Sequence, residues 1–261
     1  MAHTALERLT RDEIGRRAPA AVAVLPTAAI EQHGPHNPVG LDTMCCMAIA
    51  QGAAEAAGEV DAIVSPPLHY GSSDHHRPFP GVLSLRSGTF AQVLYEVIES
   101  LALAGFRRVF IVNGHGGNTL LVRQVAGDFV LANPSMRVIA GSYWDIARER
   151  LEAVSTDGPV AIPGHGGNFE TSLMLYLDPD LVHTDLLPIK ADADAPLTSF
   201  APPINRIARD SNVVDVHSRS FPRSWSSGLS DSSGLATREL GSTYYKIAVE
   251  ESAALLRALV D

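Results

Sequence analysis

The chain has 261 residues, of which 46% are hydrophobic and 19% are charged, and its formal net charge is -9. An acidic balance of this size argues against a broad basic face for nucleic acid or for an anionic membrane surface. No run of 18 apolar residues exists and charged residues interrupt the first twenty, so we expect neither a spanning helix nor a secretory signal. We therefore expect a cytoplasmic protein.

Apolar runs alternate with amphipathic segments along the whole chain. We predict, in order, strand 20–26, helix 43–57, strand 60–66, helix 89–104, strand 108–113, helix 120–132, strand 136–143, an apolar segment 170–177 and a long helix 237–260. Helices that alternate with strands apolar on both faces indicate an α/β fold with a parallel sheet covered on both sides.

No linker divides the chain, so we expect one domain over residues 1–261, with the Pro- and Asp-rich stretch 186–223 as an excursion from it. The adjacent pair Cys45 and Cys46 is expected on an apolar helix face, which is typical of a reducing compartment.

The first polar loop follows the first predicted strand. In extended backbone Glu31 and His33 point to the same side, and Asp42 lies at the mouth of the next helix, so the three side chains are able to converge on a cation. The alternatives are a helix N-cap role for Asp42 and a solvated histidine.

Two further loops each set a histidine among glycines. Residues 113–118 carry His115, and a dinucleotide phosphate cradle fails there because the sixth motif position is Thr119. The glycines then serve to present His115 while leaving room for a substrate. Residues 164–172 carry His165, with Glu170 five residues later.

These loops resemble the creatininase family, the creatinine amidohydrolases and their relatives. The resemblance rests on EQHGPHNPVGLDT at 31–43, YGSSDHHRPFPGVLSL at 70–85, VNGHGGN at 112–118, HGGNFETSLML at 165–175 and, more weakly, GLATRELG at 234–241. It implies a three-layer α/β/α sandwich with a mostly parallel central sheet. It also implies a hydrolase of amide-type C–N bonds that binds two divalent ions per subunit, zinc or manganese, and forms a homo-oligomer, often a hexamer.

The resemblance also assigns roles to single residues. Four fall on metal ligands, with Asp42 bridging the pair of ions that share a hydroxide: Glu31, His33, Asp42 and His115. His165 falls on the histidine that exchanges protons with the substrate or leaving group, the alternative being a histidine tied to a backbone carbonyl.

One departure from the family pattern is informative. Creatininase carries a tyrosine and a ligand glutamate after its second-loop histidine, and here Gly116 and Gly117 stand there. We hypothesise that Glu170 supplies the missing ligand, and the same departure argues against creatinine itself as the substrate.

Other polar and aromatic residues have weaker cases. We expect His36 to make a supporting hydrogen bond behind the ligands, and we place Asn118 and His76 among residues near the site or the substrate. The run 74–77 is expected as a solvated turn, or as a segment that reaches a neighbouring subunit's site. Trp144 is expected either as a lid over a small ring or as a buried aromatic.

The leading functional prediction is a two-metal amidohydrolase of a small cyclic amide, a formamide or a related polar molecule. Removal of a formyl group, trimming of a cofactor-derived peptide, and C–C hydrolysis of a cyclic diketone stay open, because the same activated water serves each. A non-catalytic metal- or nucleotide-binding module is the alternative of another class, and His165 argues against it. A serine hydrolase is disfavoured because no GxSxG motif is present.

Overall fold

A single parallel sheet organises the fold. The computed structural model describes residues 4–154, 162–190 and 227–260. Four strands run in the order β2-β1-β3-β4, and every pair is parallel: β1 (Val22–Thr27), β2 (Ala62–Val64), β3 (Arg108–Asn113) and β4 (Arg137–Ser142). The register pairs Thr27 with Asn113 and Asn113 with Ser142, so the carboxyl ends of three strands lie level.

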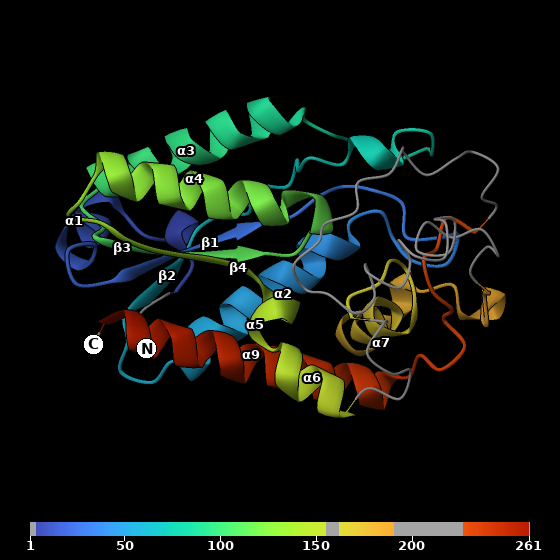
Figure 1. Ribbon diagram of the computed structural model, residues 1–261. Coiled ribbons are helices and arrows are strands. Elements are labelled where there is room, and N and C mark those ends of the chain that lie inside the picture. The colour runs from blue at the N-terminus through green and yellow to red at the C-terminus, as the bar shows by residue number, and fades with distance from the viewer. Residues whose placement is uncertain (1–3, 155–161, 191–226, 261) are drawn as a thin grey trace.

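Helices cover both faces of this sheet, as Figure 1 shows. One face carries α3 (Ser87–Leu103) and α4 (Thr119–Ala132), and the other carries α2 (Leu41–Ala56), α5 (Tyr143–Ile146) and α9 (Arg238–Val260). The predicted three-layer α/β/α architecture is confirmed. The remaining helices among the described residues are α1 (Arg11–Arg17), α6 (Arg148–Val154), α7 (Asn168–Leu177) and short 3-10 turns at Leu6–Arg8, Asp74–His76, Gly116–Asn118, Pro179–Leu181 and Thr184–Leu186.

The alternation of side chains along a strand builds two hydrophobic cores. Phe110 and Val112 of β3 face the α2/α9 layer, whereas Val109 and Ile111 face α3 and α4. All four are fully buried, which explains why the strand is apolar on both faces.

The predicted strands and helices correspond to observed ones. Cys45 and Cys46 are buried free thiols on α2, as expected. Helix α1 was not predicted, because its signal is a capping box between Thr10 and Glu13 rather than an apolar stripe. The predicted excursion at 186–223 falls largely outside the described residues.

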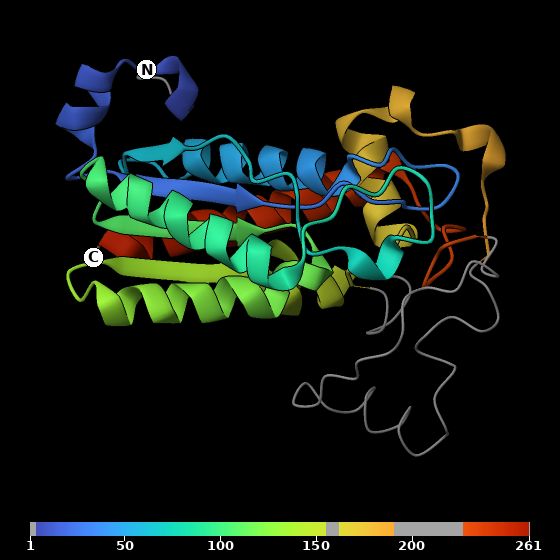
Figure 2. The ribbon, with the colours of Figure 1, turned by 90° about the horizontal axis from the view of Figure 1, so that it is seen from above.

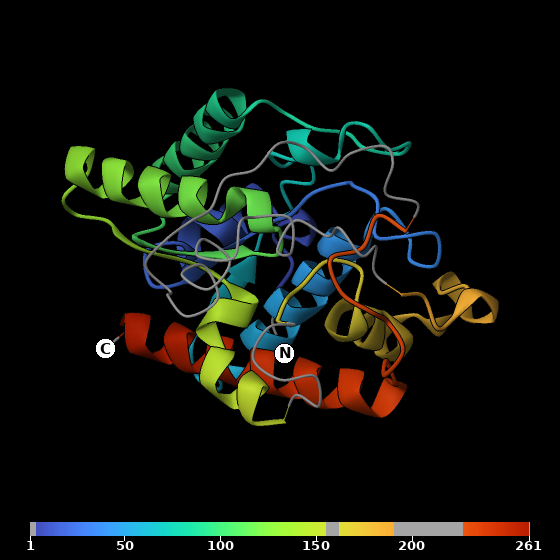
Figure 3. The same ribbon diagram turned by 45° about the vertical axis from the view of Figure 1, so that its right-hand side comes forward.

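Helix α9 approaches α7 very closely. A Cβ atom at Gly241 would overlap the backbone carbonyl of Ser172, so only glycine permits this contact. Helix α7 also packs beside α2, and Figure 3 shows this cluster of helices from the side. None of the helices in the described parts of the chain is long and apolar enough to cross a membrane.

The α3/α4 core generates a stability prediction. Phe129 is fully buried and meets Tyr95 edge to face, with ring centroids 5.1 Å apart. Phe129→Ala removes this packing and should lower the free energy of unfolding by about 3–5 kcal/mol in chemical denaturation. Leu131→Ala on the same helix is the control, because Leu131 is 82% exposed and its loss should change stability by no more than about 0.5 kcal/mol. Equal effects of the two substitutions would contradict this packing.

Candidate metal centre

Polar side chains gather beyond the carboxyl ends of β1 and β3. The loop after β1 carries Glu31 and His33, the loop after β3 carries His115, and α2 and α7 bring Asp42 and Glu170 to the same end of the sheet. Figure 2 shows these loops together beyond the strand tips. This is the edge at which parallel α/β sheets bind ligands.

Asp42 lies between two histidines. Its Oδ1 is 3.0 Å from His33 Nε2, and its Oδ2 is 3.0 Å from His115 Nδ1. Asp42 is the second residue of α2, where Gly40 is the N-cap, and its side chain does not cap the helix. The N-cap alternative is therefore wrong, and each carboxylate oxygen faces its own imidazole.

Two glutamates complete the cluster. Glu31 Oε1 lies 3.3 Å from His115 Nδ1, and its Oε2 accepts a hydrogen bond from Ser73 Oγ. Glu170 Oε2 lies 3.9 Å from His33 Nε2 and accepts a 2.6 Å hydrogen bond from Gly166 N–H. Both carboxylates are at most 5% exposed, so the structure brings all five predicted ligands together in a buried cluster.

The outward nitrogens of both histidines are tied to backbone carbonyls. His33 Nδ1 lies 3.2 Å from the carbonyl oxygen of Glu31, and His115 Nε2 lies 3.2 Å from that of Ser72. Carbonyl oxygens only accept, so these ring nitrogens carry the hydrogens and the opposite nitrogens face the carboxylates.

The donor set fits divalent cations. His33 Nε2 and Asp42 Oδ2 are buried and make no hydrogen bond, although each lies near an oppositely charged group. Groups of His33 with Glu31 and Asp42, and of His33 with His165 and Glu170, place their ligand atoms within 4.8 Å of one another. Carboxylates with imidazoles suit zinc or manganese.

The pKa shifts reflect the crowding of these carboxylates. Burial alone would lower the pKa of His33, but Asp42 and then Glu170 outweigh it and raise that pKa to about 9. The pKa of His115 is likewise raised against burial, by Glu31 and Asp42. Burial raises the pKa of Glu170. In metal-free protein, His33, His115 and Glu170 therefore bind protons more readily than the free side chains do, and metal binding would displace those protons.

Gly117 explains why the second loop lacks a ligand carboxylate. A Cβ atom there would overlap the Ser72 carbonyl oxygen and would lie 2.6 Å from His115 Nε2. No side chain fits at this position without breaking the contact that orients His115. The loop after β3 therefore has no room for a glutamate at position 117. The additional carboxylate of the cluster is Glu170, which comes from α7.

His165 borders the cluster. Its Nδ1 is 3.7 Å from Glu31 Oε1, and its Nε2 is 2.7 Å from the backbone carbonyl oxygen of Gln32. Asp231 Oδ1 accepts a 3.0 Å hydrogen bond from the His165 backbone N–H and so holds the loop. Burial, followed by the nearby His76 and His33, lowers the pKa of His165 well below its usual range.

The segment that carries His76 corrects one prediction and agrees with another, the placement of His76 near the site. A solvated turn is wrong for His76, which is 1% exposed, stacks on His165 at 4.3 Å and lies 3.4 Å from Glu31 Oε1. It joins this chain's own cluster, while Asp74 and Arg77 pair with each other at the surface. Three further residues hold the site and were not predicted from the sequence: Gln32, Ser73 and Asp231.

The other weaker predictions have mixed outcomes. His36 Nε2 is 2.9 Å from Thr171 Oγ1, directly after Glu170, which agrees with a supporting hydrogen bond. Asn118 joins the Ser72 N–H to the Ala28 carbonyl and thus ties two loops rather than facing the cluster. Trp144 is 4% exposed and packs in the α2/α9 core, so its position does not support a lid.

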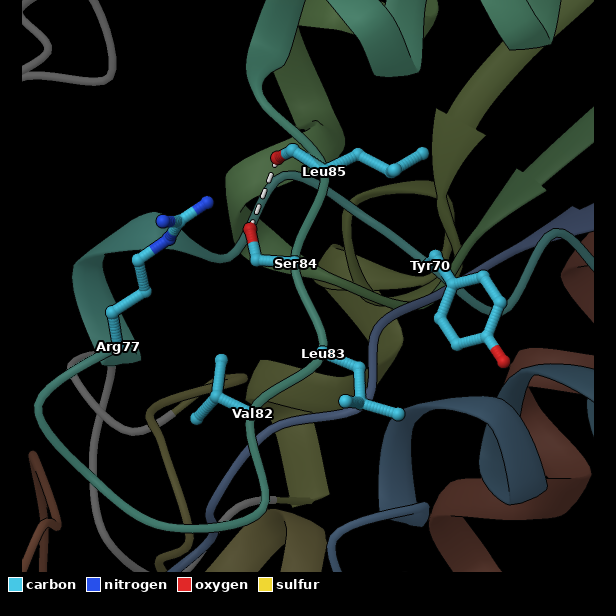
Figure 4. A pocket seen from close by; sticks show the side chains of 6 residues that line it. All are labelled: Tyr70, Arg77, Val82, Leu83, Ser84 and Leu85. Atoms are coloured by element: carbon cyan, nitrogen blue, oxygen red, sulfur yellow. Dashed lines mark hydrogen bonds between the residues drawn. The ribbon is translucent and has the colours of Figure 1, made fainter.

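A hollow of about 580 Å³ is lined by residues between positions 70 and 85 (Figure 4). Its lining residues are Tyr70, Arg77, Val82, Leu83, Ser84 and Leu85. None of them belongs to the carboxylate and histidine cluster, so the hollow alone does not define the site.

Comparison with known proteins identifies a family and relatives that match most of the chain. A family model described as creatininase, creatinine amidohydrolase, matches residues 7–256. The chain is 32% identical over 251 residues to creatinine amidohydrolase of Pseudomonas putida, covering 90% of this chain and 88% of that protein. It is 34% identical over 187 residues to the mycofactocin precursor peptide peptidase of Mycolicibacterium smegmatis, covering 69% and 67%.

Solved structures agree over nearly the full length. A creatininase described with manganese superposes with a TM-score of 0.79 at 29% identity and 98% coverage of each chain. A glutamate-to-glutamine creatininase variant described as the Zn-Zn type gives 0.78 at 29% identity, with 99% of this chain and 98% of that chain covered.

The raised pKa of His33 predicts how metal-free protein responds to alkali. A group whose pKa is higher when folded stabilises the fold below its unfolded pKa, so this contribution is present at pH 6.5 and is lost as the pH rises through about 9. The raised pKa of Glu170 acts in the same direction. The melting temperature of chelator-treated protein should fall between pH 6.5 and 9, and His33→Gln should flatten that fall. An unchanged melting temperature across this pH range would contradict the raised pKa of His33.

Proposed function

Since the chain belongs to the creatininase family of hydrolases, we propose that it hydrolyses a small polar substrate with an amide-type C–N bond at a centre for two divalent ions. The ligands would be the five buried residues of the cluster: Glu31, His33, Asp42, His115 and Glu170.

The observation that carries this proposal is the placement of Asp42. A carboxylate with one oxygen 3.0 Å from each of two histidines has the form of a bridge between two cation positions. We assign His33 and Glu170 to the first position and Glu31 and His115 to the second. Zinc or manganese bound there would supply Lewis-acid activation of water and of a substrate carbonyl oxygen.

His165 suits proton transfer in such a reaction. Its low pKa leaves the imidazole neutral at pH 7, and its Nδ1 faces the carboxylate-lined site. A neutral imidazole can accept a proton from attacking water and return it to a departing nitrogen. Its tie to the Gln32 carbonyl orients the ring for this role, so the backbone-tied alternative and the catalytic one are compatible. A non-catalytic binding module has no need of such a group.

The closed loop at Gly117 bears on the substrate. Because a glycine stands where the family resemblance implies a ligand glutamate for creatininase, we infer a substrate other than creatinine, such as a different cyclic amide or a formamide. A short cofactor-derived peptide is the second candidate, supported by 34% identity to a peptide peptidase over 187 residues.

We further propose that residues 1–261 act as one hydrolase domain and that the chain forms a homo-oligomer. The family model supports the first point because it spans residues 7–256. Exposed apolar side chains that line the hollow of Figure 4 support the second, since Tyr70 is 50% and Leu83 is 54% exposed. A cytoplasmic location stays a prediction.

Glu170→Gln tests the ligand assignment. The amide keeps the shape of the side chain but removes the anionic oxygen, so the position with His33 should lose its ion while the other is retained. Elemental analysis of the dialysed protein should show two metals per chain in the parent protein and one in the variant. Glu59→Gln, at an exposed site after α2, is the matched control. Two ions retained at parental affinity in Glu170→Gln would overturn the assignment.

His165→Ala tests proton transfer separately from metal binding. The variant should keep both ions, because His165 is outside the proposed ligand set, and kcat should fall by roughly 10² to 10⁴. Turnover of cyclic amides and formamides by metal-loaded protein provides the assay, with the exposed His183→Ala as control. Undiminished turnover in His165→Ala would refute the role.

A further inference from the structure

Gln32 stands between the two ligands of the first loop and points away from them. Its Oε1 accepts a 2.8 Å hydrogen bond from the Gly34 N–H, and its Nε2 donates a 2.8 Å hydrogen bond to the Gly228 carbonyl oxygen. A backbone N–H only donates and a carbonyl only accepts. The orientation of the side-chain amide is therefore fixed from both ends.

The same amide nitrogen faces two imidazoles. Gln32 Nε2 lies 3.1 Å from His76 Nδ1 and 3.0 Å from His165 Nε2. An amide carries two hydrogens, and Gly228 takes one, so a single hydrogen remains for the two rings.

The backbone of Gln32 decides which ring receives it. His165 Nε2 is only 2.7 Å from the Gln32 carbonyl oxygen, which can accept but not donate. This ring nitrogen must therefore carry its own hydrogen, and the remaining amide hydrogen goes to His76 Nδ1.

Each imidazole ring then has a defined tautomer. A neutral imidazole carries one hydrogen, so His165 keeps Nδ1 unprotonated, facing Glu31 Oε1 at 3.7 Å. His76 accepts at Nδ1 and carries its hydrogen on Nε2, 3.4 Å from the same Glu31 oxygen. Ser73 donates to the other oxygen of Glu31, so both oxygens of this carboxylate are held by donors.

We propose that Gln32 is the positioning residue that sets the tautomers of His165 and His76. Through its carbonyl it gives His165 a proton-accepting nitrogen towards the site, and through its amide it gives His76 an N–H that orients Glu31. This inference rests on the proposed hydrolase function for its catalytic consequence, whereas the tautomers themselves are independent of turnover.

The wild-type protein provides the first test. Solid-state NMR of protein labelled with [15N]histidine, at neutral pH and with its zinc content measured, distinguishes protonated from unprotonated ring nitrogens. Signals are assigned by their loss in His76→Gln and His165→Gln. We expect both rings to be protonated at Nε2 and unprotonated at Nδ1. A proton on Nδ1 of either neutral ring overturns the proposal, whether or not any substrate is hydrolysed.

The Gln32→Glu variant tests the role of the side-chain amide separately from that of the backbone carbonyl. A carboxylate offers no hydrogen to His76, so the His76 proton should move to Nδ1, while His165 stays protonated at Nε2 because the carbonyl remains. The kcat should fall on the order of 10- to 100-fold, as for other residues that orient metal ligands. Exposed Gln51→Glu is the charge-matched control and should change neither tautomer nor kcat.

A folded Gln32→Glu protein with an unchanged His76 tautomer would refute the role of the amide. If this variant does not fold, the wild-type spectra still decide the proposal. Loss of activity without the tautomer change would point to disturbance of the 227–235 segment instead, and would also count against it.

Discussion

The site depends on burying three carboxylates together. Glu31, Asp42 and Glu170 lie at most 5% exposed around two histidines, and unpaired charges in such surroundings are costly. The pKa values of His33 and His115 rise against the effect of burial because positive charge is required there. In metal-free protein, protons on the histidines offset the negative charge of the carboxylates. Divalent cations bound there would carry more positive charge and would offset more of it.

The parallel sheet brings these charges together from distant parts of the sequence. The level ends of β1 and β3 place the Glu31 and His115 loops side by side, and helices α2 and α7 add Asp42 and Glu170. Backbone carbonyls of the loops then fix the ring orientation of His33, His115 and His165. The scaffold thus sets not only where each side chain lies but which nitrogen it presents.

How much of the site could be predicted from the sequence depended on how far apart in the chain the interacting residues lie. Glu31 and His33 were expected on one side because strand periodicity is local, and that same alternation sends Gln32 to the other side. His76 was placed near the site only as one of two alternatives, because its contact with Gln32 joins residues 44 positions apart in a segment without periodicity. A run of charged residues is usually solvated, which favoured the other alternative. Asp231 reaches His165 over 66 residues, and the burial of Trp144 depends on how α5 meets the core, so neither was readable locally.

The close contact between Gly241 and Ser172 has a consequence for biosynthesis. Glu170 lies two residues before Ser172 on α7, and α7 has its most extensive packing against α9. Residues 238–260 are translated about seventy residues after Glu170, so α7 lacks this support while the ribosome is still making the intervening segment. The position of Glu170 in the folded protein therefore depends on a helix that is translated after it.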